Sequence, residues 1–204
     1  AGFDAGQTST RCRVCRWQED GWQILGEGSG PGVSHLEASG GAERFRQAVL
    51  ISFKAASEGQ GGRRLDAAVI GASGTEQRSA LQSRATALLA DALSLPESSV
   101  LATGDERTAL RGAFPESGGI ILISGTGMIC LGRDRQGKEH RCGGWGWMLD
   151  GAGSAFDLGH QGLQLTLQMA DGRRPDHPLR QRMWEQLGCR AHADVKAWVV
   201  QPSR

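Results

Sequence analysis

A glycine-rich turn between two apolar runs is the first stretch of this sequence that could do chemistry. Residues 120–123 are all apolar, residues 124–127 read Ser-Gly-Thr-Gly, and an apolar run resumes at 128–132. This pattern predicts a β-hairpin. Because the turn carries no bulky side chain, its backbone N–H groups can approach an anion closely, phosphate above all. An ordinary β-turn without a ligand is the alternative that this stretch alone leaves open.

The start of the chain repeats this design. Residues 2–14 read GFDAGQTSTRCRV, in which a short apolar segment meets a glycine-containing turn rich in hydroxyl groups. Asp4 stands at the end of the first expected strand, where its carboxylate could hold Mg2+. Two hairpins of one design suggest two related half-domains that bind the phosphates of one nucleotide, each from its own side.

Length, charge and cysteine content narrow the class of protein. The chain has 204 residues and a formal net charge of +1, which predicts one large or two small domains. Nothing in this charge indicates nucleic acid or a membrane surface as a partner. No apolar run approaches the ~18 residues of a membrane helix, and no signal peptide opens the chain. Five cysteines, an odd number, fit reduced thiols in the cytoplasm better than a disulfide framework.

Hydrophobic periodicity predicts alternating strands and helices in the first half of the chain, which is an α/β pattern. The Asp20-Gly21 dipeptide marks a hairpin turn between the second and third strands. The expected elements are, in chain order, strands at 1–5, 11–17 and 22–27, a helix at 42–58, a strand at 65–70, a helix at 76–93, a strand at 98–103 and a short helix ending at Phe114.

Polar residues follow three of these strands. Asp4, Ser73 and Asp105 all fall at carboxyl ends of expected strands, where open α/β sheets bind ligands. Asp105 also stands where the N-cap of the following helix belongs. The two roles are compatible, so Asp105 stays a candidate for both.

Two loops add further candidates. The stretch 26–41 is rich in Gly, Ser and Pro and predicts a long loop, in which Ser34 and His35 are the polar candidates for a ligand. Residues 143–151 read GGWGWMLDG, and Trp rings at such a loop can stack against sugars or other rings. Solvated loop residues and a packed Gly/Trp turn are the respective alternatives.

The natural boundary lies at 115–119, so we expect one domain at 1–116 and another at 117–204. The second is expected to contain the hairpin, a strand at 139–142, a helix from Ser154 to about Met169, and helices at 177–187 and 191–200. Its expected core residues are Trp184, Leu187 and Trp198.

These segments, in this order and spacing, resemble the sugar-kinase branch of the BadF/BadG/BcrA/BcrD ATPase family. The resemblance implies a ribonuclease H-like (actin-like ATPase) α/β fold, with a mixed five-stranded sheet and helices, plus an incomplete second domain of the same type. The matching stretches are GFDAGQTST (2–10), GEGSGPGVSH (26–35), ATGDERTALRGAF (102–114), ISGTGMICLGRD (123–134) and CGGWGWML (142–149).

The resemblance also implies roles for individual residues. The implied cofactors are ATP and Mg2+, with Asp4 near the metal. The phosphates would contact Asp4, Gly6, Gln7, Thr8 and Thr10 from the first hairpin, and Gly125, Thr126 and Gly127 from the second.

The implied reaction phosphorylates the 6-hydroxyl of an amino sugar, N-acetylglucosamine or glucosamine, with Asp105 as the general base. The sugar would contact Asp105, Ser34 (in place of a usual Asn), His35, Gly144, Trp145 and Asp150. No nucleic acid or membrane partner is expected, and pairing as a homodimer is open.

The sequence departs from the family pattern at several positions. Ala5 replaces a usual Gly, and Met128 replaces a usual Ser after Gly-Thr-Gly. Residues 150–154 read Asp-Gly-Ala-Gly-Ser where the family has Gly-Asp-Glu-Gly-Ser, so the Glu is lost and the Asp is shifted. The Gly-rich segment that would hold adenosine is expected beyond residue 204.

Two other hypotheses remain from the same residues. One is a non-catalytic sugar-binding or regulatory member that has lost ATP turnover. The other is the activator ATPase branch of the family, in which cysteines hold an iron–sulfur cluster between subunits. Cys130 and Cys142 are the candidates for that role.

Overall fold

The computed structural model describes residues 1–19, 21–59, 64–72, 74–75 and 77–200. Asp20 and Ser73, to which the sequence assigns a hairpin turn and a strand end, lie outside these residues. Two compact units divide the chain: Ala1–Ile121 with Leu131–His140, and Leu122–Cys130 with the chain from Arg141 onward. The assignment of domains to 1–116 and 117–204 stays a prediction.

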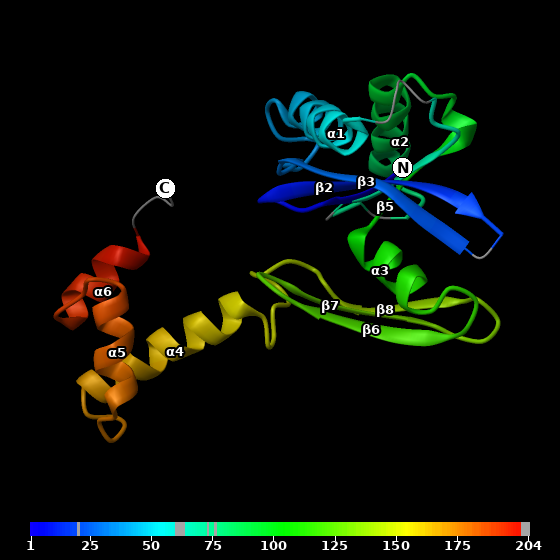
Figure 1. The fold of residues 1–204 in the computed structure, drawn as a ribbon. Coiled ribbons are helices and arrows are strands. Elements are labelled where there is room, and N and C mark those ends of the chain that lie inside the picture. Colours follow the sequence, from blue (N-terminus) through cyan, green and yellow to red (C-terminus); the bar gives the residue numbers. More distant parts are fainter. Residues whose placement is uncertain (20, 60–63, 73, 76, 201–204) are drawn as a thin grey trace. The chain divides into compact units, whose positions relative to one another are not determined.

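The first unit contains a five-stranded sheet in the order β3-β2-β1-β4-β5 (Figure 1). Strand β1 pairs antiparallel with β2 and parallel with β4, and β4 pairs parallel with β5, so the predicted mixed sheet is confirmed. The strands are β1 (Gly2–Ala5), β2 (Ser9–Gln18), β3 (Gly21–Pro31), β4 (Ala68–Ala72) and β5 (Val100–Thr103).

Helices cover both faces of this sheet. Figure 1 shows α1 (Gly41–Ser57) and α2 (Ala80–Leu93) on one face and α3 (Asp105–Ala113) on the other. A 3-10 turn at Glu97–Ser99 precedes β5. Alternate residues of β2 point into the core, which is typical of a strand with one covered face. The buried core includes Phe3, Cys12, Val14, Phe45, Val49, Ile70 and Leu89.

A close approach between β3 and α1 depends on glycine. A Cβ atom on Gly28 would lie 2.3 Å from the Ala56 amide nitrogen and 2.4 Å from the Ser52 carbonyl oxygen. Both are backbone atoms of α1, so no side-chain rotation relieves the clash. The loop prediction is therefore wrong for residues 26–31, which belong to β3 and pair with β2 as far as Ser9 opposite Pro31. The glycines there allow the helix to pack closely.

We expect Gly28→Ala to lower the free energy of unfolding by about 1–3 kcal/mol, because the new methyl group must push α1 away from the sheet. Denaturant titration measures this change. The matched control is Gly2→Ala, since no atom lies within 4 Å of a Cβ on Gly2, and its effect should stay within about 0.5 kcal/mol. Equal stability of the two variants would contradict the packing.

The remaining elements are a small sheet and three helices, as predicted. Strands β6 (Gly119–Ser124), β7 (Met128–Arg133) and β8 (Glu139–Gly143) form a three-stranded sheet in that order. They are followed by α4 (Ala155–Ala170), α5 (Pro178–Gln186) and α6 (His192–Val199).

The helices have a small core of their own around Trp184, whose indole N–H donates to Thr166 Oγ1 at 3.0 Å. Leu187 packs against this core as predicted. Trp198 does not: 43% of it is exposed, because the short helix α6 buries Val195 on its inner face instead.

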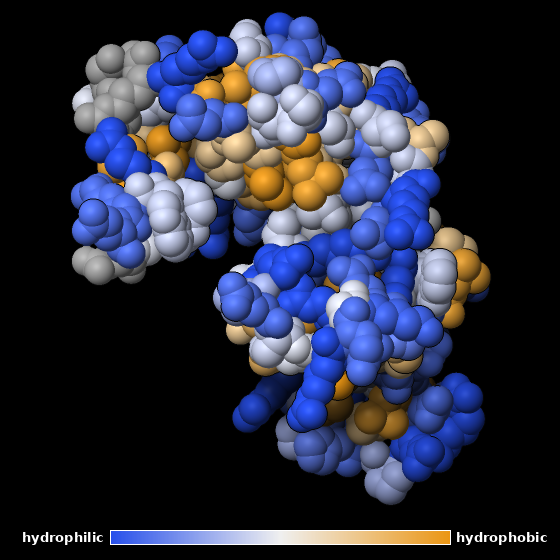
Figure 2. Space-filling view, turned by 90° about the vertical axis from the view of Figure 1, so that its right-hand side faces the viewer, coloured by the Kyte–Doolittle hydropathy of each residue, from blue (hydrophilic) through white to orange (hydrophobic). Residues whose placement is uncertain are grey.

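Figure 2 shows one face on which hydrophilic residues predominate and apolar residues gather in separate patches. Among the described residues, no helix is both long enough and apolar enough to cross a membrane.

Candidate functional site

The first glycine turn is exposed and held by a neighbouring loop. The Gly6 N–H donates to Ser9 O at 3.0 Å, which closes the turn, and the Val33 N–H donates to Gly6 O at 2.9 Å. Gln7 and Thr8 between them are exposed. The segment that carries Ser34 and His35 therefore begins directly against the turn predicted to bind phosphate.

Thr10, the last residue of the predicted phosphate motif, has a different environment. Its side chain is fully buried, because it shares the inward face of β2 with Cys12 and Val14. Its hydroxyl oxygen has no hydrogen-bond partner among the described residues. Its role at the phosphates stays a prediction, whereas Gln7 and Thr8 are accessible to a ligand.

The sheet brings Asp4 and Asp105 to the same region. Asp4 lies opposite Gly71, and Gly71 lies opposite Thr103, so these residues form one row across β1, β4 and β5. Asp105 follows Thr103 by two residues, and its Cα would lie 3.2 Å from a Cβ on Gly71. Two acidic residues therefore lie next to Gly71 in the backbone, at the carboxyl ends of parallel strands, where such sheets bind ligands.

Asp105 is the first residue of α3 rather than its N-cap, which is Gly104. The Glu106 amide donates to Asp105 Oδ1 at 3.1 Å, and Thr108 Oγ1 donates to the Asp105 carbonyl oxygen at 2.8 Å. The prediction of an N-cap was one residue off. A carboxylate in the first turn still interacts favourably with the helix dipole.

A buried glutamate next to Asp105 was missed by sequence reasoning. Glu106 is 6% exposed, and its carboxylate accepts a hydrogen bond from Arg107 Nη1 at 2.6 Å. Arg107 Nε in turn donates to Glu139 Oε2, at the start of β8, at 2.8 Å. The run Asp-Glu-Arg at 105–107 was the only signal in the sequence, and it is equally typical of a solvated helix start.

Burial raises the pKa of Glu106 above its ordinary value of 4.5, and the hydrogen bond with Asp105 raises it further. Its backbone hydrogen bond and the charge of Arg107 act in the opposite direction without reversing the shift. Folding therefore favours the protonated form of Glu106. The charged groups around Glu106 are Asp105 and Arg107, and Arg107 in turn connects it to Glu139.

This shift predicts a pH-dependent effect of Glu106→Gln. The folded state binds the Glu106 proton more tightly than the unfolded state, so wild-type stability falls as pH rises from 4.5 through the raised pKa. The glutamine variant lacks this loss. Its free energy of unfolding, relative to wild type, should therefore increase with pH and level off above the folded pKa. Urea titrations between about pH 4 and pH 8 test this.

The control for that experiment is Glu116→Gln, which changes an exposed glutamate just after α3. Its stability difference from wild type should not change over the pH range. A Glu106→Gln difference that is equally independent of pH would show that Glu106 titrates normally.

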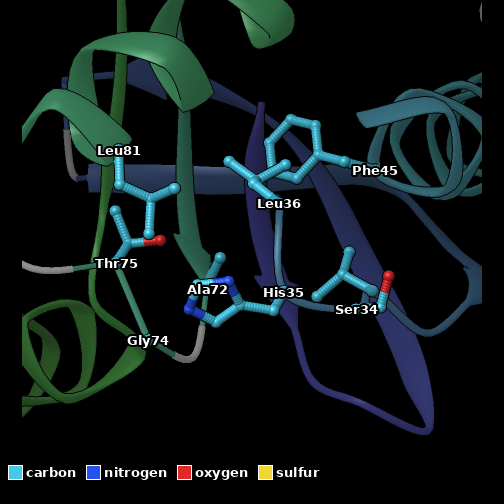
Figure 3. A pocket seen from close by; sticks show the side chains of 9 residues that line it. Ser34, His35, Leu36, Phe45, Ala72, Gly74, Thr75 and Leu81 are labelled. Atoms are coloured by element: carbon cyan, nitrogen blue, oxygen red, sulfur yellow. The ribbon is translucent and has the colours of Figure 1, made fainter. Parts of the chain in front are cut away.

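Ser34 and His35 line a small hollow (Figure 3). Its space, including the part open to solvent, is about 280 Å3. His35 Nδ1 lies 3.9 Å from Glu37 Oε2, and Thr75 contributes a hydroxyl from the segment after β4. Apolar side chains close the hollow, and its full lining is Val33, Ser34, His35, Leu36, Phe45, Ala72, Gly74, Thr75 and Leu81.

The second glycine turn is exposed and supported by the start of α4. Gly125, Thr126 and Gly127 are all exposed. The Ala155 N–H donates to Gly125 O at 2.8 Å, and Ser124 Oγ donates to Gly153 O at 2.8 Å. Exposed turn amides beside a helix N-terminus form a region that suits an anion.

The Gly/Trp loop is ordered by Arg141. Its guanidinium lies over the Trp145 ring, 4.4 Å from the centroid, and donates to the carbonyl oxygens of Gly143 and Gly144. Trp145 is 60% exposed despite this contact. The Asp150 N–H donates to Gly146 O at 2.8 Å, so Asp150 belongs to the same loop.

The cysteines carry no metal-binding arrangement among the described residues. Cys130 and Cys142, like the other cysteines, are free thiols. No group of three or more His, Cys, Asp or Glu residues in the described part could hold a metal ion.

The sheet order, the two glycine turns and the residues after the parallel strands define an actin-like ATPase fold, so the predicted fold class is confirmed. The chain belongs to the BadF/BadG/BcrA/BcrD ATPase family, whose model matches residues 1–199.

Two curated relatives are kinases. The N-acetylmuramic acid/N-acetylglucosamine kinase of Clostridium acetobutylicum is 34% identical over 96 residues, which are 47% of this chain and 31% of that protein. The N-acetyl-D-glucosamine kinase of Dictyostelium discoideum is 36% identical over 84 residues, 41% of this chain and 26% of that protein. Each match thus spans about a third or less of the relative.

Two solved structures are similar over nearly the whole chain. The proposed N-acetylglucosamine kinase of Chromobacterium violaceum has a TM-score of 0.78 at 28% identity. The matched region is 99% of this chain and 68% of the chain in that structure. The proposed N-acetylglucosamine kinase of Porphyromonas gingivalis has a TM-score of 0.68 at 20% identity, and the matched region is 98% of this chain and 66% of the chain in that structure. The second likeness supports the fold alone.

Proposed function

We propose that this protein is an ATP-dependent kinase that phosphorylates the 6-hydroxyl of an amino sugar, N-acetylglucosamine or glucosamine. The observation that carries the proposal is that two acidic residues, Asp4 and Asp105, lie next to Gly71 at the carboxyl ends of three strands. It is supported by membership of an ATPase family and by relatives named as N-acetylglucosamine kinases.

The residues present suit ATP and Mg2+. Asp4 offers an exposed carboxylate oxygen, the type of ligand that Mg2+ prefers. The exposed turn residues Gln7, Thr8, Thr126 and Gly127 would offer backbone N–H groups to phosphate oxygens, because the Gly6 and Gly125 N–H groups already donate within their turns. When bound, Mg2+ would neutralise charge on the phosphates. Each turn would contact phosphate oxygens of the nucleotide, and the sugar hydroxyl would lie near Asp105.

Asp105 would act as the general base. A sugar hydroxyl is a weak nucleophile near neutral pH, and a carboxylate within hydrogen-bond reach can accept its proton as the phosphoryl group is transferred. The Glu106 N–H donates to Asp105 Oδ1 at 3.1 Å, and this hydrogen bond would orient the carboxylate that accepts the proton.

We expect Asp105→Asn to lower the rate of sugar phosphorylation by at least 100-fold, roughly the contribution of a general base. Sugar affinity should change little, because asparagine keeps the shape and polarity of the side chain. Sugar-dependent ADP release measures the rate, and calorimetry measures binding. Asp91→Asn, at a surface residue paired with Arg46, is the control. Full activity of Asp105→Asn would exclude it as the base.

Trp145, with Ser34, His35, Gly144 and Asp150, would contact the sugar. Arg141 braces Trp145, and the exposed part of the indole is available for stacking. We expect Trp145→Ala to weaken N-acetylglucosamine binding about tenfold, equivalent to ~1.4 kcal/mol. Trp17→Ala, at an equally exposed tryptophan of β2, should not change the calorimetric affinity. Unchanged binding in both variants would remove Trp145 from the sugar site.

A second candidate function is non-catalytic sugar binding or regulation. Ala152, which stands where the family has Glu, favours it, because an alanine cannot supply a carboxylate to the sugar. The two candidates differ in one measurement. Thermal stabilisation by sugar without sugar-dependent ADP release would support binding alone. Cytoplasmic location and pairing as a homodimer stay predictions.

A further inference from the structure

The first turn of α3 carries a partly buried chain of charges beside Asp105. Glu106, Arg107 and Glu139 are connected by hydrogen bonds of 2.6 and 2.8 Å through the two sides of one guanidinium group. The side chains of Glu106 and Arg107 are only 8% and 16% exposed. Charge-assisted bonds of this kind hold their partners in a defined direction.

Stability alone explains this arrangement poorly. Removing a carboxylate and a guanidinium from water costs free energy, which their mutual attraction often fails to recover. Replacing such a buried pair with apolar residues of similar size often leaves the folded state equally stable or more stable. Exposed pairs elsewhere, such as Arg180 with Asp176, avoid this cost. A buried pair next to the predicted base therefore suggests a role in positioning.

The Glu106 side chain folds back toward the residue that precedes Asp105. A Cβ atom on Gly104 would lie 2.1 and 2.2 Å from the two Glu106 carboxylate oxygens. The same glutamate donates its backbone N–H to Asp105 Oδ1. Arg107 thus anchors the side chain of the residue whose backbone orients the Asp105 carboxylate.

We propose that Glu106 and Arg107 are positioning residues for Asp105. The chain Glu139–Arg107–Glu106 holds the first turn of α3, so that the Asp105 carboxylate stays directed for proton transfer from the sugar hydroxyl. This inference rests on the proposed kinase function and adds two residues to it. Neither residue is assigned a contact with the substrate.

The test compares Glu106→Gln, Arg107→Met and Arg107→Lys in the whole 204-residue chain. Misplacing a reacting group by about 1 Å can cost up to ~100-fold in rate. We expect Glu106→Gln and Arg107→Met to lower kcat at least tenfold while KM for the sugar stays within about twofold. Arg107→Lys, which keeps the charge, should recover part of kcat.

The controls lie on or just after the same helix. Arg111 is exposed and donates to the Pro115 carbonyl oxygen rather than to a carboxylate, and Glu116 is exposed. Arg111→Met and Glu116→Gln should retain wild-type kcat. Wild-type kcat in Glu106→Gln and Arg107→Met as well would overturn the inference.

Gly104→Ala separates position from charge. The backbone at Gly104 has φ −66°, which alanine adopts without strain. The added methyl group displaces the Glu106 carboxylate, while every charged group is retained. We expect the same loss of kcat with little change in KM, and an unchanged kcat would count against the proposed geometry.

Absence of sugar-dependent ADP release in the wild-type chain would refute the proposed function. The positioning of Asp105 by Glu106 and Arg107 is then tested separately, by hydrogen exchange of the Glu106 amide. The Glu106 amide, which donates to Asp105, should exchange at least tenfold faster in Arg107→Met, with exchange in the sheet unchanged. In Arg111→Met it should exchange as in wild type. Equal protection of the Glu106 amide in both variants would overturn the inference.

Discussion

The parallel pairing of β1 with β4, and of β4 with β5, is the constraint on which the rest of the candidate site depends. Parallel strands end at the same edge of a sheet, so residues far apart in the sequence come together there. Asp4, Gly71 and Thr103 form one row, and Asp105 follows two residues later. Gly71 lies in contact distance of α3 because it has no side chain: a Cβ there would meet Thr108 Oγ1 at 2.4 Å. The strand register and the small residue between them together bring Asp4 and Asp105, the two acidic residues of the candidate site, close in the backbone.

The two glycine turns are alike in local sequence but differ in what supports them. The turn at Gly6 is bonded to the segment that leads to Ser34 and His35, so its position is linked to one wall of the hollow. The turn at Gly125 is bonded to the start of α4, which adds a helix N-terminus. An exposed glycine turn alone is a weak anion site. In each turn, a hydrogen bond from the supporting element to a glycine carbonyl oxygen holds the turn in place.

The ion pairs of this protein occur in two environments, exposed to solvent and largely buried. Most ion pairs, such as Arg173 with Asp171, lie in solvent, where water screens them and each contributes little. The Glu106–Arg107–Glu139 chain is largely removed from water, so each member depends on its partners. Burial raises the pKa of Glu106, and the attraction of Arg107 acts in the opposite direction. Such a cost is more easily understood beside Asp105, the proposed general base, than in an ordinary core.

The sequence by itself determined the α/β class, both hairpins, and Asp4 and Asp105 as residues at strand ends, because these depend on local periodicity and turn chemistry. It misassigned residues 26–31, because the glycines that are typical of a loop serve there to admit the backbone of α1. It also gave no indication of Glu106 as a buried acid, since burial at the start of α3 depends on Gly104, Arg107 and Glu139 together. Close backbone approach and burial of charge are properties of elements packed against each other, and so only the tertiary structure decided them.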